Sequence, residues 1–145
     1  MNPDLYPAYF KVHFRGPWPD RSHPEEFAII TAYATTGETW PDERNRAADL
    51  ELENELRGTG AWMRRLIGYD SESGHAEPGW AVEIGFEEAV DLGLRFQQDA
   101  IFWVSGNRVL VSKCGPDGER SEVGLFSDRF EMEETNHPAE WESAG

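Results

Sequence analysis

The chain has little that could cross-link it, bind a metal or cross a membrane. It contains one cysteine, Cys114, so no disulfide can form within the chain. Its four histidines do not pair at a metal-binding spacing, and HExxH and CxxC motifs are absent, so no metal site is expected. No apolar run approaches the roughly 20 residues of a membrane span. The N-terminus lacks a charged-then-apolar signal layout, so we expect a cytoplasmic protein that does not bind membranes.

Basic residues are scarce as well. Thirteen Lys and Arg stand against 28 Asp and Glu, which gives a formal net charge of −15. Such a surface repels phosphate groups, so direct binding to nucleic acid backbones is not expected. Three interpretations of the acidity remain open: a coat that aids solubility, adaptation to a salt-rich cytoplasm, or an acidic face for a basic partner.

No complete catalytic signature is present. The chain has no GxSxG motif, Walker loop or dinucleotide fingerprint, and no cofactor is expected. Cys114 ends a predicted strand just before a turn, and we interpret it as a packed small residue rather than a nucleophile. The carboxylates are too numerous for one pair to stand out as acid and base.

The segments that are present predict an α+β domain. Strands are expected at residues 8–14, 27–34, 61–69 and 80–86, followed by a meander of three strands from residue 100 onward. With two helices between them, the natural packing is a two-layer sandwich: a mixed, largely antiparallel sheet with two helices on one face. Residues 1–130 should form this single domain, and residues 131–145 a loose acidic C-terminal tail.

The two helices are predicted at residues 39–58 and 86–98. Thr39 is a candidate N-cap of the first helix, with Pro41 in its first turn. An apolar stripe along this helix begins with a polar residue, Asn45, whereas Glu53 and its acidic neighbours should mostly face water. Gly93 should let the second helix approach the sheet closely. The expected core includes Ile30, Leu52, Leu56, Phe96 and Ile101.

Three polar residues, Asn45, Glu77 and Gln98, break the local pattern. Each has a structural interpretation: a hydrogen bond to the preceding turn, a solvated loop carboxylate, and a helix C-terminal hydrogen bond, respectively. Each also has a functional one, in which the side chains meet at one rim of the sheet and hold a ligand. Arg46 and Arg44 flank Asn45 and would offer a cation in an otherwise acidic protein.

The segments "FAIITAYATTG", "GYDSESGHAEPGWAV" and "EEAVDLGLRFQQDAIFW" resemble a bacterial family known as domain of unknown function 3293, over about residues 27–105. Three departures are visible: "ATTG" replaces an Asn-Pro turn, Gly79 stands where serine is usual, and Gln97 replaces the glycine of a Phe-Gly-Gln motif. The family carries no known activity, so the resemblance implies candidate residues and not a function. The matching positions are Thr31, Ala32, Asn45, Gly60, Asp70, Glu77, Pro78, Phe96 and Gln98.

Three hypotheses about function follow. The leading one is a small prokaryotic binding module whose polar pocket, near the start of the first helix, takes a small molecule or a peptide through Asn45, Glu77, Gln98 and Arg46. The alternative is an acidic inhibitor or immunity-type protein that acts through its negative surface. An acidic face on one side of the molecule would favour this alternative. The third is an enzyme with Glu77 as general base. The sequence leaves the oligomeric state open.

Overall fold

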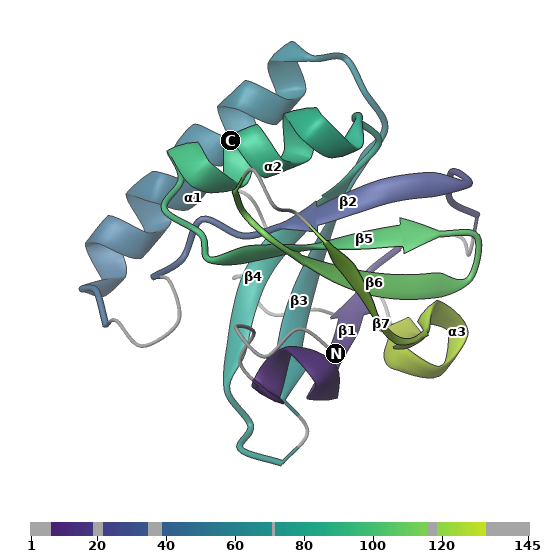
Figure 1. The fold of residues 1–145 in the computed structure, drawn as a ribbon. Helices are drawn as coiled ribbons and strands as arrows, with labels where there is room; N and C mark the ends of the chain where they lie inside the picture. Colours follow the sequence, from purple (N-terminus) through teal and green to yellow (C-terminus); the bar gives the residue numbers. More distant parts are fainter. Residues whose placement is uncertain (1–6, 19–21, 35–38, 71, 116–118, 133–145) are drawn as a thin grey trace.

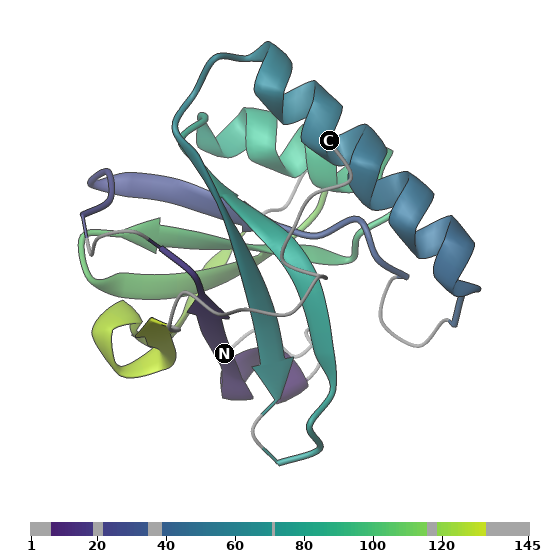
Figure 2. The same cartoon turned by 180° about the vertical axis from the view of Figure 1, so that it is seen from behind.

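An eight-stranded sheet runs through the molecule, with two long helices on one side of it (Figures 1 and 2). The structure is a computed structural model that describes residues 7–18, 22–34, 39–70, 72–115 and 119–132. The strand order is β7-β6-β5-β2-β4-β3-β1-β8. Neighbouring strands are antiparallel, except that β1 and β8 are parallel. The α+β class and the mixed, largely antiparallel sheet therefore agree with the prediction.

The elements follow one another along the chain without an internal repeat. No helix in the described ranges is long and apolar enough to cross a membrane. The bounds are η1 Pro7–Lys11, β1 Val12–Gly16, β2 Glu26–Ile30, α1 Asp42–Gly58, β3 Met63–Asp70, β4 Ala76–Val82, α2 Phe86–Arg95, β5 Ala100–Ser105, β6 Arg108–Lys113, β7 Arg120–Leu125, α3 Phe126–Arg129 and β8 Phe130–Met132.

Several strand boundaries differ from the prediction. The segment 8–14 begins as the 3-10 turn η1, and extended backbone starts only at Val12. β2 ends at Ile30, because the Thr31 hydroxyl donates to the carbonyl of Pro78 (2.9 Å) and accepts from the N–H of Tyr33 (3.1 Å). These side-chain bonds replace strand pairing at that point. β4 covers residues 76–82, so the predicted range 80–86 lies too far along the chain.

The first long helix, α1, begins at Asp42 and not at Thr39. Pro41 occupies the N-cap position, and its carbonyl accepts from the backbone N–H groups of Arg44 (3.0 Å) and Asn45 (3.1 Å). No side chain caps this helix, so the predicted capping role of Thr39 is wrong. Proline suits the position because its fixed φ is compatible with a helix start and it has no N–H that would need a partner.

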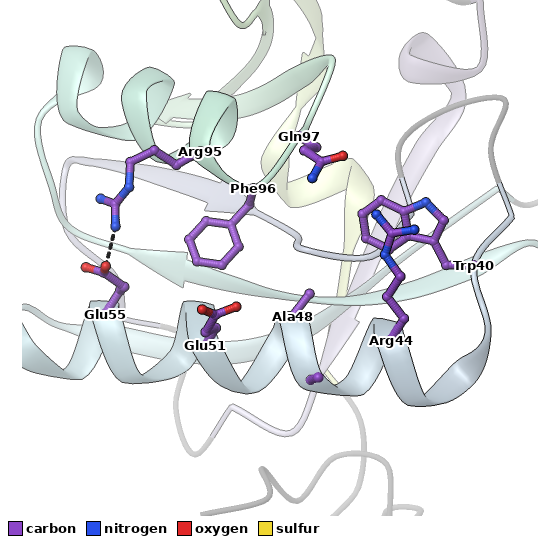
Figure 3. A pocket seen from close by; sticks show the side chains of 9 residues that line it. Trp40, Arg44, Ala48, Glu51, Glu55, Arg95, Phe96 and Gln97 are labelled. Carbon is purple, nitrogen blue, oxygen red and sulfur yellow. Dashed lines mark hydrogen bonds and ion pairs between the residues drawn. The ribbon is translucent and has the colours of Figure 1, made fainter.

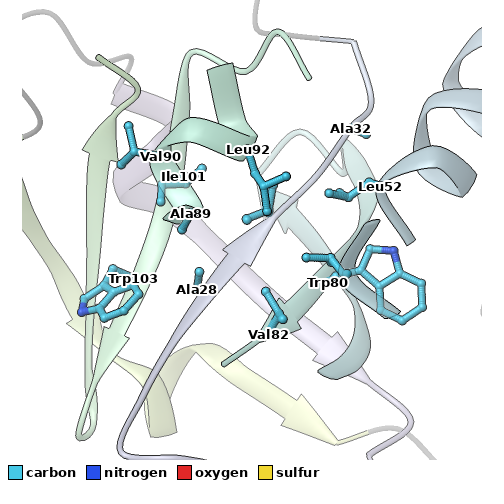
Figure 4. Close-up of a cluster of buried hydrophobic side chains, with 12 residues drawn as sticks. Ala28, Ala32, Leu52, Trp80, Val82, Ala89, Val90, Leu92, Ile101 and Trp103 are labelled. Atoms are coloured by element: carbon cyan, nitrogen blue, oxygen red, sulfur yellow. The ribbon is translucent and has the colours of Figure 1, made fainter. Parts of the chain in front are cut away.

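The first core lies between the helices and the sheet (Figure 4). Both helices contribute to this one cluster, so α1 and α2 cover the same face of the sheet, as predicted. Four of the expected core residues, Ile30, Leu52, Leu56 and Ile101, are buried. Phe96 is only partly buried, because it also lines a groove between the helices. The buried members of the cluster are Ala28, Ile30, Ala32, Leu52, Leu56, Trp80, Val82, Ala89, Val90, Leu92, Ile101 and Trp103.

A second core fills the opposite face of the sheet, which a two-layer sandwich does not include. Strand residues alternate between the faces: in β2, Phe27 and Ile29 enter the second core while Ala28 and Ile30 enter the first. The sheet curls around this aromatic cluster, so the fold is richer in sheet than the predicted sandwich. The buried members are Phe14, Trp18, Phe27, Ile29, Leu66, Ala81, Val104, Val109 and Phe126.

The guanidinium of Arg129 holds the two ends of the curled sheet together. It donates to the carbonyls of Phe10 (3.2 Å) and Val12 (2.8 Å) on one side and to that of Val123 in β7 (3.2 Å) on the other. The adjoining strand β8 pairs with β1 as far as Met132, so strand pairing continues past the predicted domain end at residue 130. Residues 133–145, the remainder of the predicted tail, lie outside the described residues.

Gly93 brings α2 close to the sheet, as its position in the helix predicted. A Cβ at this residue would lie 2.5 Å from Sγ of Cys114 and 3.0 Å from a methyl group of Ile101. Cys114 is thus a packing partner of the helix. Burial, together with the nearby Asp99, raises the pKa of its thiol to about 12. A thiol with this pKa stays protonated at neutral pH, which agrees with the interpretation of Cys114 as a packed residue and not a nucleophile.

Gly93→Ala should therefore lower the free energy of unfolding by about 1–3 kcal/mol, because the added methyl group overpacks the interface. Adding Cys114→Ala should restore part of the loss by removing the nearest atom. Thermal and urea unfolding of the variants would measure both effects. Gly58→Ala is the control, since nothing lies within 4 Å of a Cβ added there. Equal stabilities for Gly93→Ala and Gly58→Ala would contradict the close contact.

Candidate functional site

Asn45 and Gln98 hold the two sides of one peptide group. The Oδ1 atom of Asn45 accepts from the N–H of Ala34 (2.9 Å), and the Nε2 atom of Gln98 donates to the carbonyl of Tyr33 (2.8 Å). This carbonyl and this N–H belong to the peptide bond between Tyr33 and Ala34. Both side chains are buried. Because Asn45 lies in α1 and Gln98 directly after α2, both helices are tied to the segment that follows β2.

Asn45 also donates from Nδ2 to the carbonyl of Trp40, at a long 3.5 Å. Its amide therefore contacts residues on both sides of the 35–38 segment, which is the structural interpretation that the sequence offered. Gln98 donates a second bond to the carbonyl of Phe96 (3.2 Å), the expected contact at a helix C-terminus. The ligand-binding roles of Asn45 and Gln98 remain predictions.

Glu77 lies on the other face of the sheet. In β4, Trp80 and Val82 point into the first core and Ala81 points into the second. The unbroken register with β3 continues this alternation to Glu77, which therefore points to the side of Ala81, away from the helices. Its carboxylate pairs with Nε2 of His75 (2.8 Å). The structure thus brings Asn45 and Gln98 together and separates Glu77 from them.

Arg46, the fourth predicted site residue, is exposed on α1. Its ligand-binding role, like that of Glu77, remains a prediction. Among the described residues, no group of three or more His, Cys, Asp or Glu side chains could hold a metal ion.

A groove runs between α1 and α2, and we refer to it as the interhelical groove (Figure 3). Its first section, near the start of α1, has a volume of about 510 Å³, and the second, toward the end of α1, about 460 Å³. The two sections share Glu55 and Arg95, which form an ion pair across the groove. Other lining residues are Trp40, Arg44, Ala48, Glu51, Phe96 and Gln97 in the first section and Thr59, Glu88, Asp91, Leu92 and Leu94 in the second.

Apolar surface forms much of this groove. Phe96 points toward α1 near Ala48, and the guanidinium of Arg44 lies over the ring of Trp40, 3.7 Å from its centroid (Figure 3). In the second section, Leu94 has 51% of its surface exposed, unusually much for a large apolar residue. A surface that combines aromatic and aliphatic groups with charges at its rim is typical of a site that binds another molecule.

The sequence analysis did not predict this groove, although a signal for it exists. Residues 44, 48, 51 and 55 recur at helical spacing, so they form a second face of α1 beside the buried stripe. Two groove residues, Arg44 and Gln97, are the direct neighbours of the buried Asn45 and Gln98. The buried amides of Asn45 and Gln98 bond to the backbone after β2, whereas Arg44 and Gln97 line the groove.

Among the helices and strands, the excess of negative charge lies in α1 and α2. The eight strands and α3 carry six acidic and seven basic residues. In contrast, α1 and α2 carry nine acidic residues and four basic ones. The groove repeats this excess, with Glu51, Glu55, Glu88 and Asp91 against two arginines. The acidic residues of the helices are Asp42, Glu43, Asp49, Glu51, Glu53, Glu55, Glu87, Glu88 and Asp91.

Two acidic residues of α1 are buried beneath the helix, contrary to the prediction that Glu53 faces water. Glu53 is only 1% exposed and pairs with Arg57 (2.6 Å). Asp49 accepts two parallel hydrogen bonds from Arg65 of β3 (2.9 and 2.8 Å). With Asn45, these residues form a polar row at spacings of four, which was visible in the sequence. Burial and the charge of Asp49 raise the pKa of the Tyr33 hydroxyl, so this phenol stays neutral at neutral pH.

Gln97 has a left-handed backbone with φ of +59°, a conformation that glycine adopts most readily. It directly follows the C-cap of α2. The N–H of Gln97 bonds to the carbonyl of Leu94 (3.1 Å) and the N–H of Gln98 to that of Gly93 (2.8 Å). These two bonds define a Schellman motif, in which this position usually holds glycine. The geometry explains why glycine suits the Phe-Gly-Gln motif and why Gln97 is an unfavourable substitute.

Asn45→Ala should lower the free energy of unfolding by about 1–3 kcal/mol, because the N–H of Ala34 loses its buried acceptor. Asn54→Ala, an exposed change on the same helix, should stay within about 0.5 kcal/mol. Urea unfolding would measure both. If Asn45→Ala were as stable as the wild type or more stable, a site strained for ligand binding would explain Asn45 better than a structural bond.

Gln97→Gly should raise the stability by about 1 kcal/mol, since glycine adopts a positive φ without a Cβ penalty. Gln97→Ala serves as the control, because alanine keeps the Cβ and should bring no gain. A melting temperature that rises only for the glycine variant would confirm the strain. A decrease with glycine would mean that the Gln97 side chain makes a stabilising contact that outweighs it.

Comparison with known proteins identifies a family for this chain but indicates no activity. A profile of DUF3293, described as a protein of unknown function, matches residues 30–101. No curated protein and no solved structure shows significant similarity to the chain. The matched segment contains both long helices and all residues that line the interhelical groove. It also contains Asn45 and Gln98, which bond to the peptide group between Tyr33 and Ala34. Over residues 30–101, the chain belongs to the DUF3293 family.

Proposed function

We propose that this protein is a binding module whose site is the interhelical groove, and that the groove takes a basic segment of a protein partner with an apolar face. The observation that supports the proposal is the position of a partly apolar groove between two acidic helices. Like the pocket predicted from the sequence, the first section of the groove lies near the start of the first helix. Its lining residues differ from those predicted.

The shape of the groove favours a peptide over a compact small molecule. Two open sections lie one after the other along α1 instead of forming one enclosed cavity. Phe96 in the first section and Leu94 in the second offer separate places for apolar side chains. α1 and α2 run side by side in opposite directions, and a groove between two such helices can dock an amphipathic segment whose apolar residues enter the groove.

The charge of the groove favours a basic partner. Glu51, Glu88 and Asp91 lie along the groove, while the charge of Arg95 is offset by its ion pair with Glu55. Acidic groups at the rim would attract lysine or arginine side chains during encounter and would repel acidic segments. The hypothesis of an acidic inhibitor thus concerns the same face of the molecule as the binding module.

The hypothesis of an enzyme with Glu77 as general base receives less support. His75 and Glu77 form a hydrogen bond near the tip of the β3–β4 hairpin, where the His75 side chain is 72% exposed. Neither residue lines the interhelical groove. General bases act best where water is excluded and the substrate is held in place.

The proposal predicts binding of a designed peptide of about 15 residues, in which leucines at helical spacing form one face and arginines the other. Fluorescence anisotropy should detect its binding, with an affinity that decreases as salt is added. A peptide with glutamate in place of each arginine should not bind. Equal affinity for the two peptides would contradict the proposal.

Two matched pairs of variants locate the site. Leu94→Ser should weaken binding about tenfold through the loss of an apolar contact. Leu125→Ser, the other exposed large apolar residue in the described part of the chain, should have no effect. Glu51→Gln should weaken binding more than Glu131→Gln, which removes the same charge from β8. If the control variants lost as much affinity as the groove variants, the site would lie elsewhere.

A further inference from the structure

We infer that Trp40 and Glu51 form a subsite for an arginine side chain of the partner, and that Arg44 occupies this subsite until the partner displaces it. The inference rests on the proposed function, because it names the group that the first section of the interhelical groove recognises. It goes beyond that function in two respects. It assigns a guanidinium group to one place in the groove, and it identifies Arg44 as a side chain of the protein that competes for that place.

The contact between Arg44 and Trp40 shows what the subsite accepts. The guanidinium carbon lies 3.7 Å from the centroid of the indole ring, the closest of the cation–π contacts in the described part of the chain. At this distance the cation lies directly over the ring face, where the negative potential of the aromatic system is strongest. The ring face turned toward the groove is therefore suited to a planar cation.

The surroundings allow exchange of that cation. Arg44 is exposed on α1, so its side chain can leave the ring for solvent, whereas Trp40 is only 8% exposed and stays in place. The carbonyl of Trp40 bonds to the buried Asn45, which helps to position the indole. Glu51 lies two turns after Arg44 on the same face of α1 and lines the same section. An incoming guanidinium would therefore meet the aromatic face, and a carboxylate about 10 Å further along α1 would attract it through its charge.

Displacement explains why an acidic groove would carry an arginine at its entrance. With no partner bound, Arg44 covers the indole and lowers the local negative charge. A basic segment brings its own guanidinium, which forms the same ring contact and adds the attraction of Glu51. Arg44 then moves into water, where an arginine is well solvated. The cost of this exchange reduces affinity and selects partners that supply a guanidinium at the matching position.

The test compares Arg44→Met with Arg64→Met by using the arginine–leucine peptide described above. Arg64 also lies over a tryptophan, Trp62, at 5.1 Å, but on β3 and outside the groove. The two changes therefore remove the same charge and the same type of contact. Arg44→Met should raise the affinity about fivefold, as expected for the loss of a competing cation–π contact, while Arg64→Met should leave it within about twofold.

Two further measurements separate this effect from general electrostatics. A peptide with lysine in place of arginine keeps the charge but loses the planar guanidinium, and it should gain less from Arg44→Met. The indole N–H signal of Trp40, assigned by its loss in Trp40→Phe, should shift when the arginine peptide is added to ¹⁵N-labelled protein. Circular dichroism would verify that each variant is folded.

The outcomes distinguish the subsite from the proposed function. If the peptide binds the wild type but Arg44→Met and Arg64→Met have equal affinity, the subsite is wrong and the groove proposal stands. An increase for the lysine peptide equal to that for the arginine peptide would also overturn the subsite. If none of the proteins binds the arginine peptide, the proposed function fails, and the subsite fails with it.

Discussion

The arrangement of the helices depends on one peptide group, the bond between Tyr33 and Ala34. Its N–H is held by Asn45 of α1 and its carbonyl by Gln98 after α2, and both side chains are buried. This half-buried peptide group has a partner for its N–H and one for its carbonyl, and each partner comes from a different helix. The hydrogen bonds therefore link the two helices to each other through the end of β2. The interhelical groove lies between helices whose ends are fixed in this way.

Much of the fold could be predicted from patterns that extend over several residues. The stripe of Leu52 and Leu56 identified the buried face of α1, and the nearly all-apolar run of residues 27–34 indicated a central strand covered on at least one face. Element ends could not be predicted as well, because single side chains decide them. Thr31 ends β2 through bonds to Pro78 and Tyr33, whose position depends on tertiary structure.

The curl of the sheet and the groove between the helices depend on partners that are far apart in the chain. Arg129 joins β7 to the carbonyls of Phe10 and Val12, a contact that no local pattern predicts. Asp49 of α1 is buried against Arg65 of β3, which accounts for its two hydrogen bonds. Of the four predicted site residues, Asn45 and Gln98 converge on the backbone of the segment that follows β2. Their sequence neighbours Arg44 and Gln97 line the groove. The polar residues in the apolar stripe thus lie near the proposed groove but do not line it.

The most direct test of this account is a double-mutant cycle of Asn45→Ala and Gln98→Ala, with the free energy of unfolding measured in urea. Because both side chains bind one peptide group, the loss of either should weaken the contact that remains. We expect a coupling energy of about 0.5–2 kcal/mol, as found for residues in one hydrogen-bond network. Additive losses, with a coupling energy indistinguishable from zero, would show that the two residues act independently and would contradict the account.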